Sequence, residues 1–182
     1  MKPKKEDFVL TDNNVIPFFF EYAKQNPQKR VQVETDYGNF VIELNEKTPY
    51  HRANFIYLAK ANYFDGTFFH RVVPNFIIQG GNSDQASTSK KRRRIGKYLL
   101  PPDTRNGLRH HRGAVSMPSS EIENPHRLAS PYEFFIVQQR LVPIIWMENT
   151  RYLGMSLKGW RLSIKSIVFR LINENGRLTM CV

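Results

Sequence analysis

Arg71 is the residue of this sequence whose type and setting most suggest chemistry. Together with His70 it stands inside an apolar stretch, FFHRVVPNFIIQGG, that runs from residue 68 to residue 81. Arginine is rarely surrounded by apolar residues unless its guanidinium, a rigid fork of hydrogen-bond donors, has a use there. One interpretation is therefore a cationic donor placed for function. The other is an arginine at a strand edge that extends its charged end into water.

The elements that must position this arginine are mostly strands. β-branched and aromatic residues, bounded by proline and glycine, predict a strand, a tight bend and a second strand over residues 68–81. Residues 31–44 alternate around a central turn, which predicts a β-hairpin. Thr48 opens a predicted helix, and apolar residues at helical spacing predict another helix from Asn13.

The arginine-bearing stretch resembles the signature of the cyclophilin-type peptidyl-prolyl isomerases, FHRV-x-P-x-F-x-x-QGG. Two further segments are similar to that family in the same order: NYFDGT at residues 62–67 and GAVSMPSS…SPYEFFI at residues 113–136. The resemblance covers residues 31–139 and then stops. It implies a mainly β fold, a cyclophilin-like closed antiparallel β-barrel capped by helices.

The resemblance implies a peptidyl-prolyl cis-trans isomerase that acts on proline-containing peptides and folding proteins. Rotating a prolyl amide requires no metal, cofactor or nucleophile; it requires a pocket for the ring and a donor to the twisted nitrogen. The catalytic residues implied are Arg71 as that donor, supported by His70 and Gln79. The substrate-binding residues implied are Phe76, Ile77, Phe135, Met117, Ser119 and Glu133. Taken singly, Phe76 and Phe135 are better explained as core aromatic residues, but together, in order and at the family's spacing, they are better explained as a pocket.

The chain departs from the family at two places. Residues 118–120 read Pro–Ser–Ser where the family usually has Ala–Asn–Ala, so backbone contacts to a substrate could differ. Glu133 replaces the usual Gln before Phe–Phe. A carboxylate there could pair with Arg71, either tightening its placement or competing with the substrate for its donors. These departures keep open a module that binds proline peptides without turnover.

Composition limits the remaining classes. The chain of 182 residues has a net charge of +11 and one cysteine, Cys181, which excludes an intrachain disulfide. No His/Cys grouping has metal-site spacing, and no apolar run approaches membrane-span length. We expect a cytoplasmic monomer with no cofactor. A periplasmic location remains open, because an export signal could be absent from the sequence as written.

The densest positive charge lies in Lys90–Arg94, KKRRR, within a polar, turn-rich segment at residues 82–112. Such a run resembles a nuclear-localisation or nucleic-acid-binding patch. No aromatic residues are interleaved with it to stack on bases. We therefore predict a solvated loop and no nucleic-acid partner, with a nucleic-acid binder as the rival hypothesis.

The sequence after Gln139 lacks the family's remaining motifs. Back-translation offers a reason. When the reading frame begins one nucleotide before each written codon, the codons of Trp146, Met147 and Glu148 necessarily encode Asp–Gly. Permitted codons for the neighbouring residues extend this to LDGKYTVFG. That string resembles the family segment expected at this point. We expect an out-of-frame tail, with a single-base insertion or deletion near codons 139–141. The alternative is a diverged tail.

The predicted organisation therefore has three parts. Residues 1–30 form an N-terminal arm and helix, residues 31–139 an incomplete cyclophilin-like domain, and residues 140–182 the out-of-frame tail. If the chain is made as written, the last strands and helix are missing or replaced, and sheet edges are exposed. We would then expect a poorly soluble, weakly active or inactive truncated cyclophilin.

Overall fold

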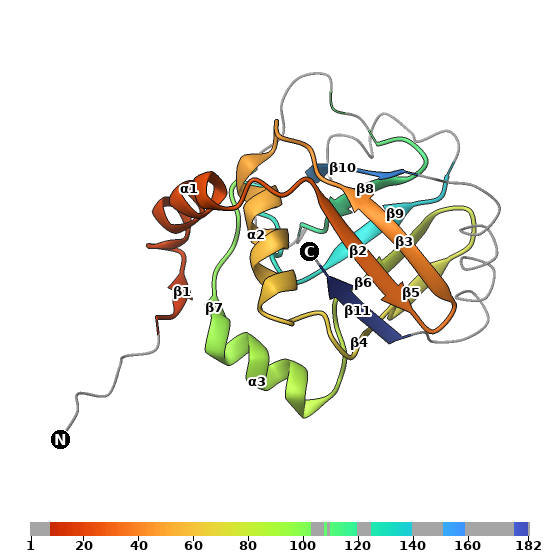
Figure 1. Ribbon diagram of the computed structural model, residues 1–182, viewed down its shortest axis with the longest axis horizontal. Helices are drawn as coiled ribbons and strands as arrows, with labels where there is room; N and C mark the ends of the chain where they lie inside the picture. Colours follow the sequence, from red (N-terminus) through yellow and green to blue (C-terminus); the bar gives the residue numbers. More distant parts are fainter. Residues whose placement is uncertain are drawn as a thin grey trace.

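The computed structural model describes residues 8–102, 108, 110–119, 125–139, 151–158 and 177–181. Within this part of the chain, nine strands form one sheet in the order β4-β11-β2-β3-β10-β8-β9-β6-β5. Two short strands, β1 and β7, pair separately and in parallel. Figure 1 shows the large sheet with α2 against it and with α1 and α3 further out.

The bounds of the elements are as follows. The strands are β1 (Leu10–Thr11), β2 (Arg30–Thr35), β3 (Gly38–Glu43), β4 (Thr67–Phe68), β5 (Arg71–Val73), β6 (Ile77–Gly80), β7 (Gly96–Lys97), β8 (Ala114–Met117), β9 (Phe134–Val137), β10 (Arg151–Lys158) and β11 (Arg177–Cys181). The helices are α1 (Val15–Gln25), α2 (Pro49–Lys60) and α3 (Ala86–Ile95).

Both predicted strand pairs are confirmed, the one within residues 31–44 and the one within residues 68–81. β2 and β3 pair antiparallel through a turn that joins Thr35 to Gly38. β5 and β6 pair antiparallel around a bend in which the Phe76 amide donates to the Val73 carbonyl at 3.1 Å. Proline and asparagine at this bend suit its conformation, since Asn75 has a φ of 59°.

The two predicted helices are also confirmed, and they pack on each other. α2 is buried on most of its surface because it lies between α1 and the sheet (Figure 1). The contact between the helices is aromatic: the Tyr57 ring meets the rings of Phe18 and Phe19 edge-on, with centroids 5.3 and 5.8 Å apart. α1 therefore forms an outer layer over α2.

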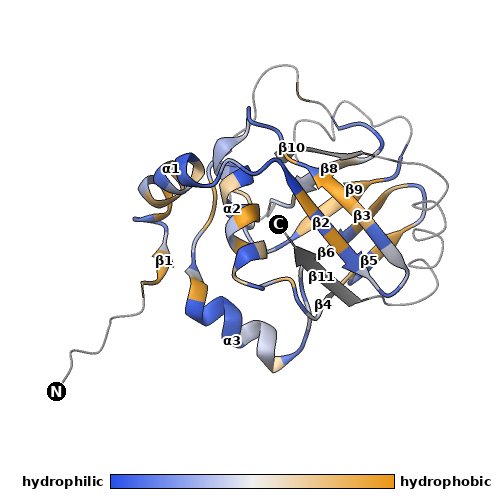
Figure 2. Ribbon diagram, in the orientation of Figure 1, coloured by the Kyte–Doolittle hydropathy of each residue, from blue (hydrophilic) through white to orange (hydrophobic). Residues whose placement is uncertain are grey.

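The prediction of a loop over residues 82–112 is wrong for residues 86–95, which form α3. Lysine and arginine are good helix formers, and no glycine or proline interrupts the segment. The helix ends at Gly96, whose φ is 138° and where a side chain would overlap the Leu10 backbone. Figure 2 shows α3 largely in the hydrophilic colour, in contrast to the strands of the sheet.

The main core lies between the sheet and α2. It contains alternate residues of the central strands, for example Val115, Ile136 and Ile78, which face one another across β8, β9 and β6. Because side chains alternate along a strand, the residues between them face the opposite side of the sheet. That opposite side carries Gln79 and Phe135, in one cross-strand row with Arg71.

The predicted closed barrel is not shown by the strand pairing, since the order of the described strands ends at β4 and β5. The predicted loss of the closing strands is not confirmed either. β10 and β11 both lie in the tail. β10 pairs with β3 and β8, and β11 pairs with β2 and β4. Trp146–Glu148, on which the argument for a second frame depends, lie outside the described residues.

Candidate active site

One cross-strand row brings together three of the predicted site residues. Arg71 on β5 is opposite Gln79 on β6, Gln79 is opposite Phe135 on β9, and Phe135 is opposite Ser116 on β8. Directly opposed residues of antiparallel strands project from the same face of a sheet. The register therefore sets a cation, an amide and an aromatic ring side by side, on the face away from the main core.

An apolar cluster lies on the same face, separate from the main core. Ile77, Ala114, Phe135 and Val137 are its buried members, and Phe76 and Leu108 pack against it. Ile77 and Phe135 are each only 3% exposed. The three apolar residues predicted to hold a proline ring, Phe76, Ile77 and Phe135, are thus brought together beside Gln79.

Arg71 lies at the end of the sheet on β5 and is exposed. Its guanidinium makes no hydrogen bond or ion pair with any residue that the structure describes. A guanidinium keeps its charge at all relevant pH values and offers five N–H donors. As far as the described residues go, Arg71 therefore presents unused donors beside Gln79.

Glu133 occupies the centre of a polar network on the other side of Gln79. Its carboxylate accepts from Gln79 Nε2 at 2.8 Å and from Asn82 Nδ2 at 3.2 Å, and it lies 3.6 Å from His70 Nε2. Burial alone would raise the pKa of Glu133, but the hydrogen bonds from His70 and Gln79 and the charges of His70 and Arg92 outweigh it and lower that pKa. Glu133 is therefore an anion, and its partners are these groups rather than Arg71.

Comparison with known proteins identifies the family. The model of the cyclophilin type peptidyl-prolyl cis-trans isomerase/CLD family matches residues 30–152, more than half of the chain. The chain belongs to this family. A peptidyl-prolyl cis-trans isomerase of Schizosaccharomyces pombe is 36% identical over 122 residues, which cover 65% of this chain and 72% of that protein.

A second relative is a peptidyl-prolyl cis-trans isomerase of Acinetobacter baylyi, 38% identical over 107 residues. The match covers 58% of this chain and 53% of that protein, so the chain spans about half the length of this relative. Among solved structures, a Cryptosporidium parvum cyclophilin type isomerase, crystallised with the dipeptide Ala-Pro, has a TM-score of 0.64. It is 22% identical and covers 84% of this chain and 98% of its own, which shows the cyclophilin fold.

Two residues predicted from the cyclophilin resemblance are not part of the apolar cluster. Met117 is fully buried in the main core, on the face of β8 opposite to Ser116. Ser119 is half-buried beyond the end of β8, and its hydroxyl donates to the Leu128 carbonyl at 3.0 Å. Ser120 lies outside the described residues.

His110 was not predicted as part of the cyclophilin site. Its ring lies parallel to that of Phe135, with 6.0 Å between the centroids, and its Nε2 is 2.9 Å from the Ser116 hydroxyl. Burial, together with the nearby charge of His111, lowers the pKa of His110 to about 4. The ring is therefore neutral near pH 7 and backs Phe135 as a flat wall. Only the tertiary contact reveals this, because the sequence shows merely two adjacent histidines.

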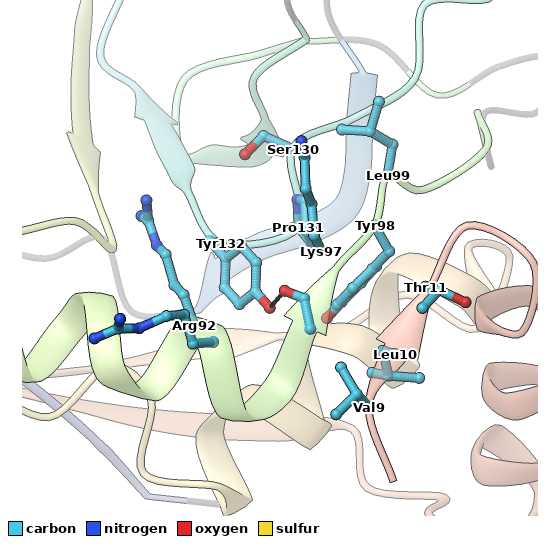
Figure 3. Close-up of a pocket in the computed structure, with 12 residues that line it drawn as sticks. Val9, Leu10, Thr11, Arg92, Lys97, Tyr98, Leu99, Ser130, Pro131 and Tyr132 are labelled. Atoms are coloured by element: carbon cyan, nitrogen blue, oxygen red, sulfur yellow. Dashed lines mark hydrogen bonds between the residues drawn. The ribbon is translucent and has the colours of Figure 1, made fainter.

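The KKRRR run divides into residues that dock α3 and residues that face solvent. Lys91 Nζ donates to the Asn62 and Asp65 carbonyls at 2.6 and 2.8 Å. Arg92 Nε donates to the Tyr63 hydroxyl at 2.9 Å, and its guanidinium lies over the Tyr132 ring at 5.2 Å (Figure 3). The exposed members of the run are Lys90, Arg93 and Arg94.

Two cavities of about 580 Å³ flank this helix and the polar network. One lies between β1, β7 and residues 130–132, where the Tyr132 hydroxyl donates to the Gly96 carbonyl at 2.6 Å (Figure 3). The other is lined by Phe68, His70 and residues 82–85. Within the described residues, no cluster of His, Cys, Asp and Glu could hold a metal ion, and no helix is long and apolar enough to cross a membrane.

Proposed function

We propose that this chain is a peptidyl-prolyl cis-trans isomerase that accelerates rotation about Xaa-Pro bonds in folding proteins. The observation that carries the proposal is the row in which the exposed Arg71 stands beside Gln79 and Phe135. Uncatalysed isomerisation takes tens to hundreds of seconds, roughly, at 25 °C, so it can limit folding. The relatives named as peptidyl-prolyl cis-trans isomerases support the same activity.

The apolar cluster provides the binding part of the mechanism. A proline ring placed against Ile77, Phe76 and Phe135 exchanges water for apolar contact, which contributes a few kcal/mol, at about 25 cal/mol per Å² buried. Phe135 cannot easily move aside, because His110 stacks behind it. The ring of the substrate is held while the rest of the peptide remains free to rotate about the amide.

Arg71 provides the catalytic part. Rotation of the amide is opposed by about 18–20 kcal/mol, because the planar amide loses its resonance. At the twisted geometry the prolyl nitrogen regains its lone pair and accepts a hydrogen bond, which neither planar isomer does. A donor aimed at that nitrogen therefore binds the transition state more tightly than either ground state, which lowers the barrier. Gln79 lies opposite Arg71 in the same row, and its amide donates to Glu133.

An exchange assay on an Xaa-Pro peptide, performed beside a binding titration with the same peptide, tests this function. We expect both binding and acceleration. Binding without acceleration would instead identify a proline-peptide binding module. That alternative is favoured by the Ser119 hydroxyl, which is already engaged with the Leu128 carbonyl at a position where the family has a substrate-contacting segment.

The finer architecture that we propose is a closed barrel. β4 and β5, the two ends of the strand order, are consecutive in the chain. In addition, the Phe68 amide on β4 donates to the Asn82 carbonyl just beyond β6 at 2.9 Å. Slow hydrogen exchange of the Phe68 amide would be expected for a closed barrel, and exchange at the rate of an open edge would contradict it.

We also propose that the tail from about residue 140 is encoded out of frame. The proposal is based on the codons of Trp146, Met147 and Glu148, which necessarily spell Asp–Gly in the second frame. Sequencing the coding DNA across codons 135–150 tests it. One missing or extra base is expected, whereas codons that do not spell the family segment in the second frame would refute it.

We propose no nucleic-acid role for the KKRRR run. Lys91 and Arg92 already hold α3 on the domain through their contacts with Asn62, Tyr63 and Asp65. A monomer acting on proline peptides remains our proposal. Sedimentation of the purified chain tests the monomer, and nucleic-acid binding that persists after Lys90, Arg93 and Arg94 are neutralised would show that this run is not responsible.

A further inference from the structure

Glu133 is in a position to orient the amide of Gln79. A carboxylate can only accept hydrogen bonds, so the amide group that contacts it must present its NH2 side. The contact from Gln79 Nε2 to Glu133 Oε2 measures 2.8 Å. The carbonyl oxygen of the Gln79 amide is therefore turned away from Glu133 and is left to accept from other donors.

The same carboxylate is a potential competitor of the substrate. Glu133 directly precedes β9 and accepts a hydrogen bond from Gln79, the residue that lies opposite Arg71. An anion at this place would attract a free guanidinium and occupy the donors that the reaction needs. Something must hold Glu133 on the far side of Gln79.

Arg92 of α3 contributes to this, together with the direct contacts from Asn82 and His70. Its guanidinium donates to Asn82 Oδ1 at 3.0 Å, Asn82 Nδ2 donates to Glu133 Oε1 at 3.2 Å, and the same guanidinium nitrogen of Arg92 is 3.9 Å from that carboxylate oxygen. The guanidinium is itself fixed, by the Tyr63 hydroxyl and by the ring of Tyr132. The cation is thus anchored near Glu133 Oε1, whereas Gln79 donates to Oε2.

We infer that Arg92 is a positioning residue for the isomerase site: through Asn82 and Glu133 it orients Gln79 and keeps Arg71 available to the substrate. The inference rests on the proposed function of Arg71. It gives α3 a role in the reaction that does not depend on α3 touching the substrate. It also explains how a glutamate is accommodated at a position where the family usually has glutamine.

A double-mutant cycle on the full chain tests this inference. We expect Arg92→Met to lower kcat/KM about tenfold, since the released carboxylate then pairs with Arg71. Glu133→Gln alone should lower kcat/KM about threefold, because glutamine can present either end of its amide to Gln79. The double variant should be no worse than Glu133→Gln, because the competing anion is gone. Arg94→Met, an exposed arginine two residues further along α3, is the matched control and should stay within about twofold of the unmodified chain.

Several outcomes overturn the inference. The inference fails if Arg92→Met is as active as the Arg94→Met control. It also fails if the double variant is as impaired as Arg92→Met, because the loss of a purely structural arginine is not rescued by removing the carboxylate of Glu133. If Arg92→Met fails to fold, the side-chain amide of Gln79 is followed by ¹⁵N NMR in Glu133→Gln, where an unchanged resonance contradicts the inference. Arg71→Ala separates the two proposals: if it leaves the rate unchanged, the proposed function fails whatever Arg92 does.

Discussion

The apolar side of the site comes from strands of the sheet, whereas the polar side is completed by a helix outside it. Ile77, Phe135 and Val137 are set by the register of β6 and β9 alone. Glu133, in contrast, is held not only by Gln79 of β6 but also by Asn82 and His70, which lie outside the named strands, and by Arg92 of α3. Changes to the apolar side should therefore affect both folding and binding, while changes to the polar side should mainly affect turnover.

The largest effect expected is on the apolar side. Phe135→Ala removes a buried ring of the apolar cluster that stacks on His110, and a Phe→Ala change of this kind costs about 3–5 kcal/mol of stability. Urea denaturation measures it. Phe20→Ala, at an exposed position of α1, is the control and should change stability by no more than about 0.5 kcal/mol. Equal losses in the two variants would show that the cluster is not a packed unit.

The next effect concerns the wall behind Phe135 and depends on pH. Burial lowers the pKa of His110 to about 4, so below about pH 6.5 the unfolded chain takes up a proton that the folded chain does not. Stability should fall as the pH drops from about 6.5 to 4, by on the order of 3 kcal/mol from this group. Denaturation of His110→Gln at several pH values should give a flatter profile. The exposed His126→Gln is the control, and an identical slope in all three proteins would contradict the buried, neutral ring.

The smallest effect is expected where α3 docks. Lys91→Ala removes the donor to the Asn62 and Asp65 carbonyls and should cost about 1 kcal/mol, the net value of such contacts. The neighbouring Lys90 is exposed, so Lys90→Ala should be neutral. Thermal denaturation of both variants checks this. A loss in Lys90→Ala as large as in Lys91→Ala would indicate that the helix is stabilised by its charge rather than by docking.

The sequence predicted the part of the site that strands carry better than the part that α3 supplies, for a physical reason. Strand, bend and strand leave a local pattern of β-branched residues around Pro74, and this pattern is enough to pair Arg71 with Gln79. α3 leaves no such pattern, because it docks through Lys91 and Arg92 rather than through an apolar stripe. A charged segment of this kind is easily taken for a loop.

Met117 and His110 illustrate two further limits. Side chains alternate along a strand, so once Ser116 lies opposite Phe135, Met117 must face the main core. The motif around Met117 does not reveal which face of the sheet Met117 occupies unless the residue paired with its neighbour is known. His110 meets Phe135 only through the folded chain, and neither residue carries a local signal for the other.

The most direct test of the account is the isomerisation rate of Arg71→Ala on an Xaa-Pro peptide, together with the Kd of that peptide. The donor acts on the twisted amide and the ring is held by the apolar cluster, so we expect the rate to fall about a hundredfold. The Kd should change by no more than about threefold, because the cluster remains intact. A variant that isomerises the peptide as fast as the unmodified chain would contradict the central role of Arg71.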